Sequence, residues 1–307
     1  MQTSGRVPST GSRPVPSRWR ARTARLVAWA QEVHRRAEVR YPVVIHLADR
    51  MVSVNIFDTA TRLASLCFLA AVPLLFVFAA YAPPAIRDQL IRSMRSVFGL
   101  TGPADAEIQQ LMQPQGESLR QTTGVIGVLM VLISATAVSR AVQRLCKRSW
   151  EIPRGGRVAP WRWVAWLALW ITALVLQGSL HDGFGLGAWL GVPVTLVAEV
   201  GLWWWTQHLL LGGCVAWKPL LPGALITAIT LTALTATARF YMPRALNRAL
   251  AGYGALGSVF VLLSWLIVVC LAATVSVSCG AVLAQEPFLA DRLGSPPPSR
   301  DRDAGTI

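Results

Sequence analysis

YGALGSVFVLLSWL (residues 253–266) belongs to the longest uncharged stretch of this sequence, which extends from Ala249 to Gln285. A helix rises about 1.5 Å per residue and the hydrocarbon layer of a membrane is about 30 Å thick, so about twenty apolar residues span it. A helix over residues 253–284 is longer than that, and it must tilt, bend or extend beyond the layer. The stretch therefore predicts a membrane-spanning helix.

The composition of the whole chain agrees with this interpretation. Of the 307 residues, 53% are hydrophobic and only 14% are charged, whereas soluble domains are about 25% charged. The net charge of +14 lies largely at the borders of the apolar runs and outside any aromatic nucleic-acid-binding motif. We therefore expect membrane lipids as partners and no nucleic acid.

Apolar runs of comparable length precede the opening stretch. They predict an all-α, polytopic membrane protein with six transmembrane helices and flanking amphipathic helices. The expected spans cover residues 61–82, 121–139, 161–181, 187–211, 219–240 and 253–284.

Polar segments flank this membrane domain of residues 61–286. Residues 1–17 are rich in Pro, Ser, Gly and Arg and predict a disordered basic N-terminus, and residues 18–60 predict an amphipathic juxtamembrane segment. Residues 287–307 predict a disordered tail. After the first span, Ile86, Leu90, Met94 and Val97 recur at helical spacing and predict an amphipathic helix that lies flat on the outer leaflet. A lid, a lipid guide and a plain surface helix all agree with this pattern.

The distribution of charge predicts the orientation. Six spans place both termini on one side, and arginine is abundant before the first span and between the second and third. The positive-inside rule then places both termini in the cytoplasm, where anionic lipid headgroups are expected partners. Arg239, Arg244 and Arg248 depart from the rule, because they fall in the last outer loop.

Small residues repeat every four positions in the last two spans. Helices in lipid associate by close packing, so this pattern predicts a tight antiparallel pair, with Gly254 and Gly257 allowing close backbone approach. A polar path lined by the Thr and Ser side chains is the functional alternative. The repeats are Ala224, Ala228, Thr232 and Ala236 in the fifth span and Ala272, Ser276 and Gly280 in the sixth.

Glu199 and Pro73 are the candidate functional residues within the spans. A carboxyl group at mid-span is costly and indicates a substrate, ion or proton site, or else a side chain bonded to a Thr, Ser or carbonyl group of a neighbouring helix. Pro73 lies inside the first span, where it removes a backbone hydrogen bond and either fits a bend to the bundle or opens a cavity.

Motifs for chemistry are missing from the sequence. It has no Walker A, GxSxG, HExxH or dinucleotide-binding glycine pattern. The five cysteines have neither CxxC spacing nor a histidine at metal spacing. We therefore predict no enzyme, no catalytic residue, no cofactor, no metal and no disulfide.

Two motifs resemble those of the YihY / virulence factor BrkB family. These are WKPLLPGALITAI (residues 217–229) and YGALGSVFVLLSWLIVV (residues 253–269). VPLLF (residues 72–76) and SRAVQRLCKRSWEIP (residues 139–153) are similar to further family segments, and the resemblance covers about residues 45–286.

The resemblance implies a multi-pass protein of the bacterial inner membrane with a role in the cell envelope. Lipid export is one of the roles proposed for members of the family. The family was once labelled a ribonuclease. This sequence contains no nuclease metal cluster, so it does not support that label. We expect a protein that transports or organises a lipid or amphiphile. The alternative is a non-transporting scaffold for envelope enzymes, and a homo-oligomer or an envelope-protein partner is compatible with both.

Overall fold

The computed structural model describes residues 47, 50–52, 54–99, 102–111, 117–152, 160–181 and 188–296. Over these residues it contains helices and no strand, so the all-α prediction is confirmed for this part of the chain. The predictions for the N-terminal segment up to residue 46 lie outside the described residues. The helices are α3 (Ile56–Tyr81), α4 (Pro84–Phe98), α5 (Pro103–Leu111), α6 (Glu117–Ser149), α7 (Pro160–His181), α8 (Ala188–Leu210), α9 (Trp217–Gln285) and α10 (Pro287–Leu293).

Proline opens several of these helices. Pro84, Pro103, Pro160 and Pro287 are the first residues of α4, α5, α7 and α10. A proline fits the first helical turn because its fixed φ suits a helix and the missing N–H would have no intrahelical partner there. These positions explain where the helices begin.

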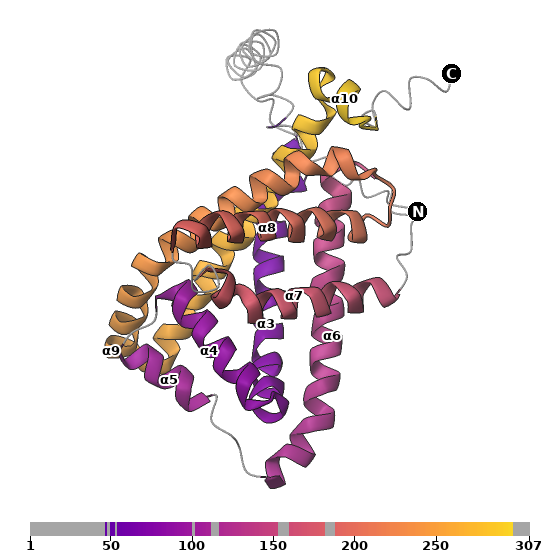
Figure 1. Ribbon diagram of the computed structural model, residues 1–307. Helices are drawn as coiled ribbons and strands as arrows, with labels where there is room; N and C mark the ends of the chain where they lie inside the picture. The colour runs from indigo at the N-terminus through magenta and orange to yellow at the C-terminus, as the bar shows by residue number, and fades with distance from the viewer. Residues whose placement is uncertain are drawn as a thin grey trace, which may run out of the picture. The chain divides into compact units, whose positions relative to one another are not determined.

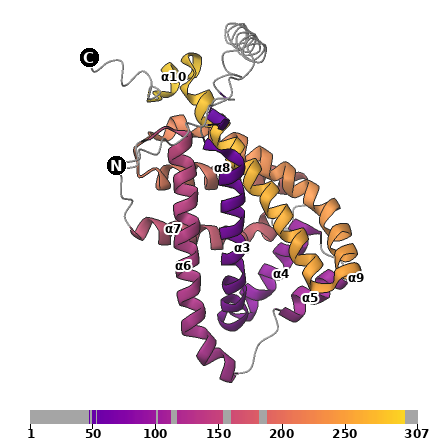
Figure 2. The same ribbon diagram turned by 180° about the vertical axis from the view of Figure 1, so that it is seen from behind.

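The helix α9 turns back on itself at Gly254 and forms a helical hairpin. Gly254 has φ 60° and ψ −149°, a conformation that essentially only glycine adopts. We call residues 217–253 the first limb and residues 255–285 the second limb. In Figures 1 and 2 the first limb, in orange, and the second limb, in yellow, run side by side from the turn.

This hairpin corrects one expectation from the sequence. The fifth span was predicted to end at residue 240 and to be followed by a loop, but the helix continues through Arg244 and Arg248 to the turn. Arginine, alanine and leucine are strong helix formers, so this charged segment leaves the apolar run without leaving the helix.

The other long helices pack around this hairpin. The helix α3 packs on α6 and α9, whereas α8 packs on α7 and α9. Figure 1 shows α7 and α8 crossing in front of α3 and α6, and Figure 2 shows the same crossing from behind. Their shared core includes Ala64, Cys146, Trp203, Ala224 and Val277, all buried.

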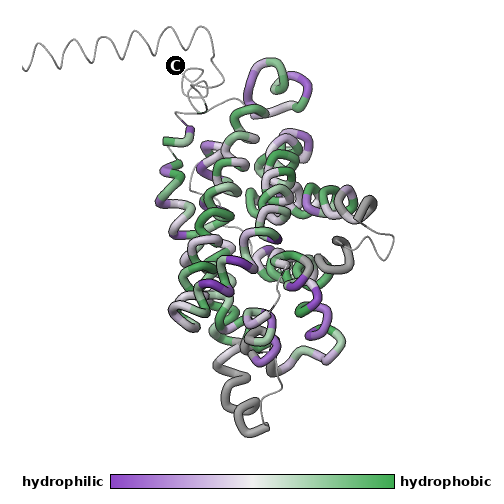
Figure 3. Tube along the Cα trace, turned by 90° about the vertical axis from the view of Figure 1, so that its left-hand side faces the viewer, coloured by the Kyte–Doolittle hydropathy of each residue, from purple (hydrophilic) through white to green (hydrophobic). Residues whose placement is uncertain are grey.

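Three helices of the described part are long and apolar enough to cross a membrane, judged by length and composition. Their apolar stretches are Ile56–Leu75, Leu129–Ser149 and Trp217–Gln285, and α7 adds a shorter one, Trp161–Leu176. Figure 3 shows that hydrophobic residues dominate along the helices. Large apolar side chains such as Leu69, Ile133 and Phe260 are exposed, an arrangement that suits contact with lipid.

One of the two flanking segments differs from its prediction. The tail was predicted to be disordered from residue 287, but residues 287–293 form α10, which packs on α9. Pro287 starts this helix, and Gly294, in the left-handed conformation with φ 67°, ends it. The predicted amphipathic helix is present as α4, and it packs on α7, where Ser93 Oγ donates a 2.9 Å hydrogen bond to Val175 O; its position on the outer leaflet stays a prediction.

Candidate functional site

A cavity of about 510 Å³ lies among α4, α7, α8 and α9. Its walls are mostly leucine, alanine, valine and tryptophan side chains, which makes it an apolar chamber with few polar groups. Apart from the tryptophan ring nitrogens, the polar lining side chains come from α7, α8 and the first limb of α9. They are Thr172, Thr195, Glu199 and Thr235.

Glu199 is the charged residue of this lining. It lies in the middle of α8, and its Oε2 accepts a hydrogen bond of 3.3 Å from Thr232 Oγ1 of α9. Thr232 belongs to the stripe of small residues that was predicted in the fifth span. The structure thus brings the two predicted residues together, and the same carboxyl group also borders the cavity.

Thr195 adds a second polar group on the same face of α8. It is four residues before Glu199, so the two side chains are neighbours on the helix surface. Thr195 is only 5% exposed, and its hydroxyl group has no hydrogen-bond partner among the described residues. A buried hydroxyl group without a partner costs about 1–3 kcal/mol, and it leaves a hydrogen-bond donor beside Glu199.

Gly201 lines the cavity at an exposed position of α8. A Cβ atom at this position would meet no other atom within 4 Å, although the residue lies inside α8 and lines the cavity. Neither Thr195 nor Gly201 stands out in the sequence. The four-residue spacing of Thr195 from Glu199 is the signal that could have found the first of them.

Tryptophans form the wall on the side of α7 and α8. The rings of Trp170 and Trp203 meet edge to face with centroids 5.5 Å apart. Trp170 Nε1 also donates a 3.3 Å hydrogen bond to Thr206 Oγ1, which fixes the ring between the two helices. Such edge-to-face pairs contribute about 0.5–1.5 kcal/mol of stabilisation beyond that from burial of the rings, so the pair helps to hold this wall in place.

The end of α4 closes the cavity with Val97 and Phe98. The helix ends at Gly99, which has φ 61°, and a Cβ atom there would lie 2.8 Å from Arg239 O of α9. Glycine is thus required both for the turn and for the close approach to α9. This contact places the end of α4 on the first limb.

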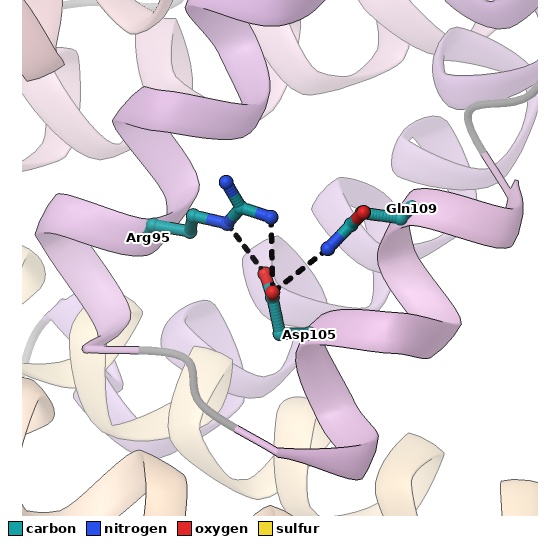
Figure 4. A network of polar contacts seen from close by, with 3 residues as sticks. All are labelled: Arg95, Asp105 and Gln109. Atoms are coloured by element: carbon teal, nitrogen blue, oxygen red, sulfur yellow. Dashed lines mark hydrogen bonds and ion pairs between the residues drawn. The ribbon is translucent and has the colours of Figure 1, made fainter.

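An ion pair between α4 and α5 holds this turn (Figure 4). Arg95 donates two hydrogen bonds to Asp105, of 2.6 Å from Nε and 2.9 Å from an Nη nitrogen, and Gln109 Nε2 donates another of 2.8 Å. The hydrogen bonds from Arg95 lower the pKa of Asp105. The backbone N–H of Ala104 bonds to Asn247 Oδ1 at 3.3 Å, which ties α5 to the first limb.

The remaining predicted residues lie elsewhere. Pro73 is inside α3 and is not among the lining residues of the cavity. Gly280 lies directly against Gly223 across the hairpin, and Gly257 approaches the carbonyl group of Ala249. The other members of the predicted packing set differ in burial: Ala224, Ala228 and Ser276 are buried, Ala272 is half-buried, and Ala236 and Gly254 are exposed.

No group of three or more His, Cys, Asp or Glu side chains within the described ranges could hold a metal ion. The cavity offers a carboxyl group, hydroxyl groups and an apolar wall. This arrangement can bind a ligand that is part polar and part apolar.

Comparison with known proteins assigns the family. The family model described as virulence factor BrkB matches residues 47–300, which include all the helices described above. Comparisons with curated proteins and with solved structures find no match. The chain, with its long apolar helices and the cavity beside Glu199, belongs to the virulence factor BrkB family.

Proposed function

We propose that this chain is an integral protein of the bacterial inner membrane that binds a lipid or another amphiphile in the Glu199 cavity and transports or organises it. The observation that carries the proposal is a carboxyl group and an unpartnered buried hydroxyl group in a chamber with apolar walls. Polar groups inside a membrane domain are costly, so they mark the path of a substrate or ion.

The proposed topology has six spans and cytoplasmic termini. The α9 hairpin provides two antiparallel passes, α3 and α6 provide two more, and α7 and α8 complete the set. The basic residues before the first span and after the second agree with this orientation by the positive-inside rule.

The cavity selects the ligand by its size and by its polar groups. A volume of about 510 Å³ is within the range of about 300–1,000 Å³ that holds small ligands, so it takes a headgroup or one chain of a lipid. Glu199 would repel a phosphate group but accepts hydrogen bonds from an ammonium or hydroxyl group. We therefore propose a ligand with such a group next to an apolar part.

Substitution Glu199→Gln tests this proposal, because it removes the charge and keeps the shape. The protein is purified in nanodiscs of native membrane lipid, and its lipid content is compared with that of an unrelated six-span protein from the same membrane. We expect one lipid class to be enriched with the wild type and lost in Glu199→Gln. The matched control is Asp291→Asn on α10, an exposed acid far along the chain from the cavity lining.

Transport is distinguished from scaffolding by a second assay. Wild-type protein in vesicles is expected to speed the transfer of a fluorescent analogue of the enriched lipid between leaflets, and Glu199→Gln is expected to abolish this. Transfer at the rate of protein-free vesicles would favour a scaffold that binds lipid without moving it. A lipid profile equal to that of the bulk membrane, unchanged by Glu199→Gln, would contradict the proposed function.

A further inference from the structure

A second hollow lies at the turn of the α9 hairpin. It is a groove of about 1090 Å³ between the two limbs, separate from the Glu199 cavity in its lining residues. The first limb contributes Phe240, Tyr241, Arg244 and Arg248, and the second limb contributes Leu256 and Phe260.

The two arginines give this groove its charge. Arg244 and Arg248 are four residues apart, so they project from the same face of the first limb, and both are exposed. No acidic side chain is among the described residues that line the groove. Arg248 has no ion-pair partner in the described part of the chain, and Arg244 donates one 2.7 Å hydrogen bond from Nη1 to the carbonyl oxygen of Phe240. Since a guanidinium group has five N–H donors, both side chains keep donors for an anion.

The apolar side chains of the groove suit an acyl chain. Phe240, Tyr253, Leu256 and Phe260 are large and strongly exposed, and the uncharged part of the second limb begins beside them. Arginine and tyrosine beside exposed aliphatic and aromatic groups are typical of the depth at which lipid headgroups meet acyl chains. The groove thus offers cationic donors and an apolar strip side by side.

A second copy of this chain is a poorer occupant. A two-fold dimer brings the same patch of both copies together, which would place two pairs of arginines face to face with no acid between them. A lipid phosphate supplies the missing negative charge and accepts paired hydrogen bonds from arginine.

We propose that the Arg244–Arg248 groove binds the phosphate headgroup of an anionic membrane lipid, whose acyl chain lies along Phe240, Leu256 and Phe260. This goes beyond the proposed function, because it needs the chain to lie in a membrane but does not need the Glu199 cavity to hold a ligand. It also gives a role to the arginines that depart from the positive-inside rule.

The stacked pair of Tyr241 and Trp265 marks the boundary between the groove and the cavity. Their ring centroids are 5.8 Å apart; Tyr241 lines the groove and Trp265 lines the cavity. Lipid bound in the groove would therefore contact one ring of a pair whose other ring faces the Glu199 cavity.

The test uses the full-length protein, stripped of lipid in detergent and titrated with phosphatidylglycerol or with phosphatidylcholine of the same acyl chains. Native mass spectrometry counts the bound lipids. The wild type is expected to prefer phosphatidylglycerol over phosphatidylcholine. In the double variant Arg244→Gln with Arg248→Gln, this preference is expected to fall about fivefold for each arginine removed. Replacement of both by lysine keeps the charge and is expected to keep most of the preference.

The matched control removes two exposed arginines elsewhere, Arg92→Gln with Arg292→Gln, and is expected to keep the preference. Equal binding of both lipids by the wild type would overturn the proposal, as would an equal loss in the control. Glu199→Gln separates this site from the proposed function, because it is expected to leave the phosphatidylglycerol preference unchanged. A preference lost in Glu199→Gln and kept in the double arginine variant would also overturn it.

Discussion

Replacement of Gly280 by alanine tests the contact on which the α9 hairpin depends. A methyl group at Gly280 would overlap Gly223 Cα and lie 2.6 Å from Gly223 N, and both glycines are buried. Non-bonded heavy atoms in ordinary contact are about 3.5–4.0 Å apart, so the two limbs must separate by about 1.5 Å or more. Both contacted atoms belong to the backbone, so no side-chain rotation relieves the overlap.

The expected loss of stability follows from two opposing effects. Overpacking of this kind costs about 1–3 kcal/mol. A change from glycine to alanine inside a helix gains up to about 1 kcal/mol, because alanine is the better helix former. We therefore expect Gly280→Ala to lower the free energy of unfolding by about 1–2 kcal/mol.

The assay is equilibrium unfolding in mixed micelles with increasing sodium dodecyl sulfate, followed by circular dichroism. Gly252→Ala is the matched control, because Gly252 is in the same helix and a Cβ atom there meets nothing within 4 Å. The control is expected to be unchanged or more stable. If Gly280→Ala is as stable as Gly252→Ala, the limbs do not touch at Gly223 and the reasoning is refuted.

Three further predictions concern other contacts. The lowered pKa of Asp105 means that its ion pair with Arg95 stabilises the α4–α5 turn at neutral pH. This contribution is at most about 1 kcal/mol, and it is lost as pH falls below about 4. Hydrogen exchange of α4 and α5 at varied pH would detect the loss. A turn whose pH dependence is the same in Arg95→Gln would contradict this. Cys67 of α3 and Cys270 of the second limb belong to the same hydrophobic core, so mild oxidation is expected to cross-link α3 to the second limb, as peptide mass spectrometry would show; no cross-link would argue against this packing. Arg50 is 8% exposed and pairs with Glu151 at 2.7 Å, so Arg50→Met is expected to destabilise the fold by about 1–3 kcal/mol, and unchanged thermal unfolding would count against the pair.

Much of the helix pattern was predictable from the sequence, because it depends on local properties. Long apolar runs predicted the region of α9, and the four-residue spacing of Ile86, Leu90 and Met94 predicted α4. The continuation of the helix through Arg244 was missed because charge was taken as the end of a span, although charge does not end a helix. The six-span topology stays a prediction, because length and composition support three spanning helices in the described part, one of them the folded-back α9.

The candidate site was predictable only in part. A carboxyl group within an apolar run drew attention to Glu199 without any knowledge of its neighbours. The cavity itself depends on how α4, α7, α8 and α9 meet, so Gly201 carries no signal in the sequence and Thr195 is indicated only by its four-residue spacing from Glu199. Thr232 was predicted for packing, and its contact with Glu199 came from the relative rotation of α8 and α9, which no local pattern specifies.

The most direct test of lipid binding beside Glu199 is to obstruct the cavity at Gly201 and to count the bound lipid. Gly201→Trp places a large ring at an exposed position of the cavity lining, where a Cβ atom meets nothing within 4 Å, whereas Gly252→Trp adds the same ring at an equally open position outside the lining. Native mass spectrometry of each variant released from nanodiscs measures the lipid that remains bound. We expect Gly201→Trp to lose the lipid class enriched with the wild type and Gly252→Trp to keep it. Equal retention of this lipid by Gly201→Trp would contradict the claim that the Glu199 cavity is the binding site.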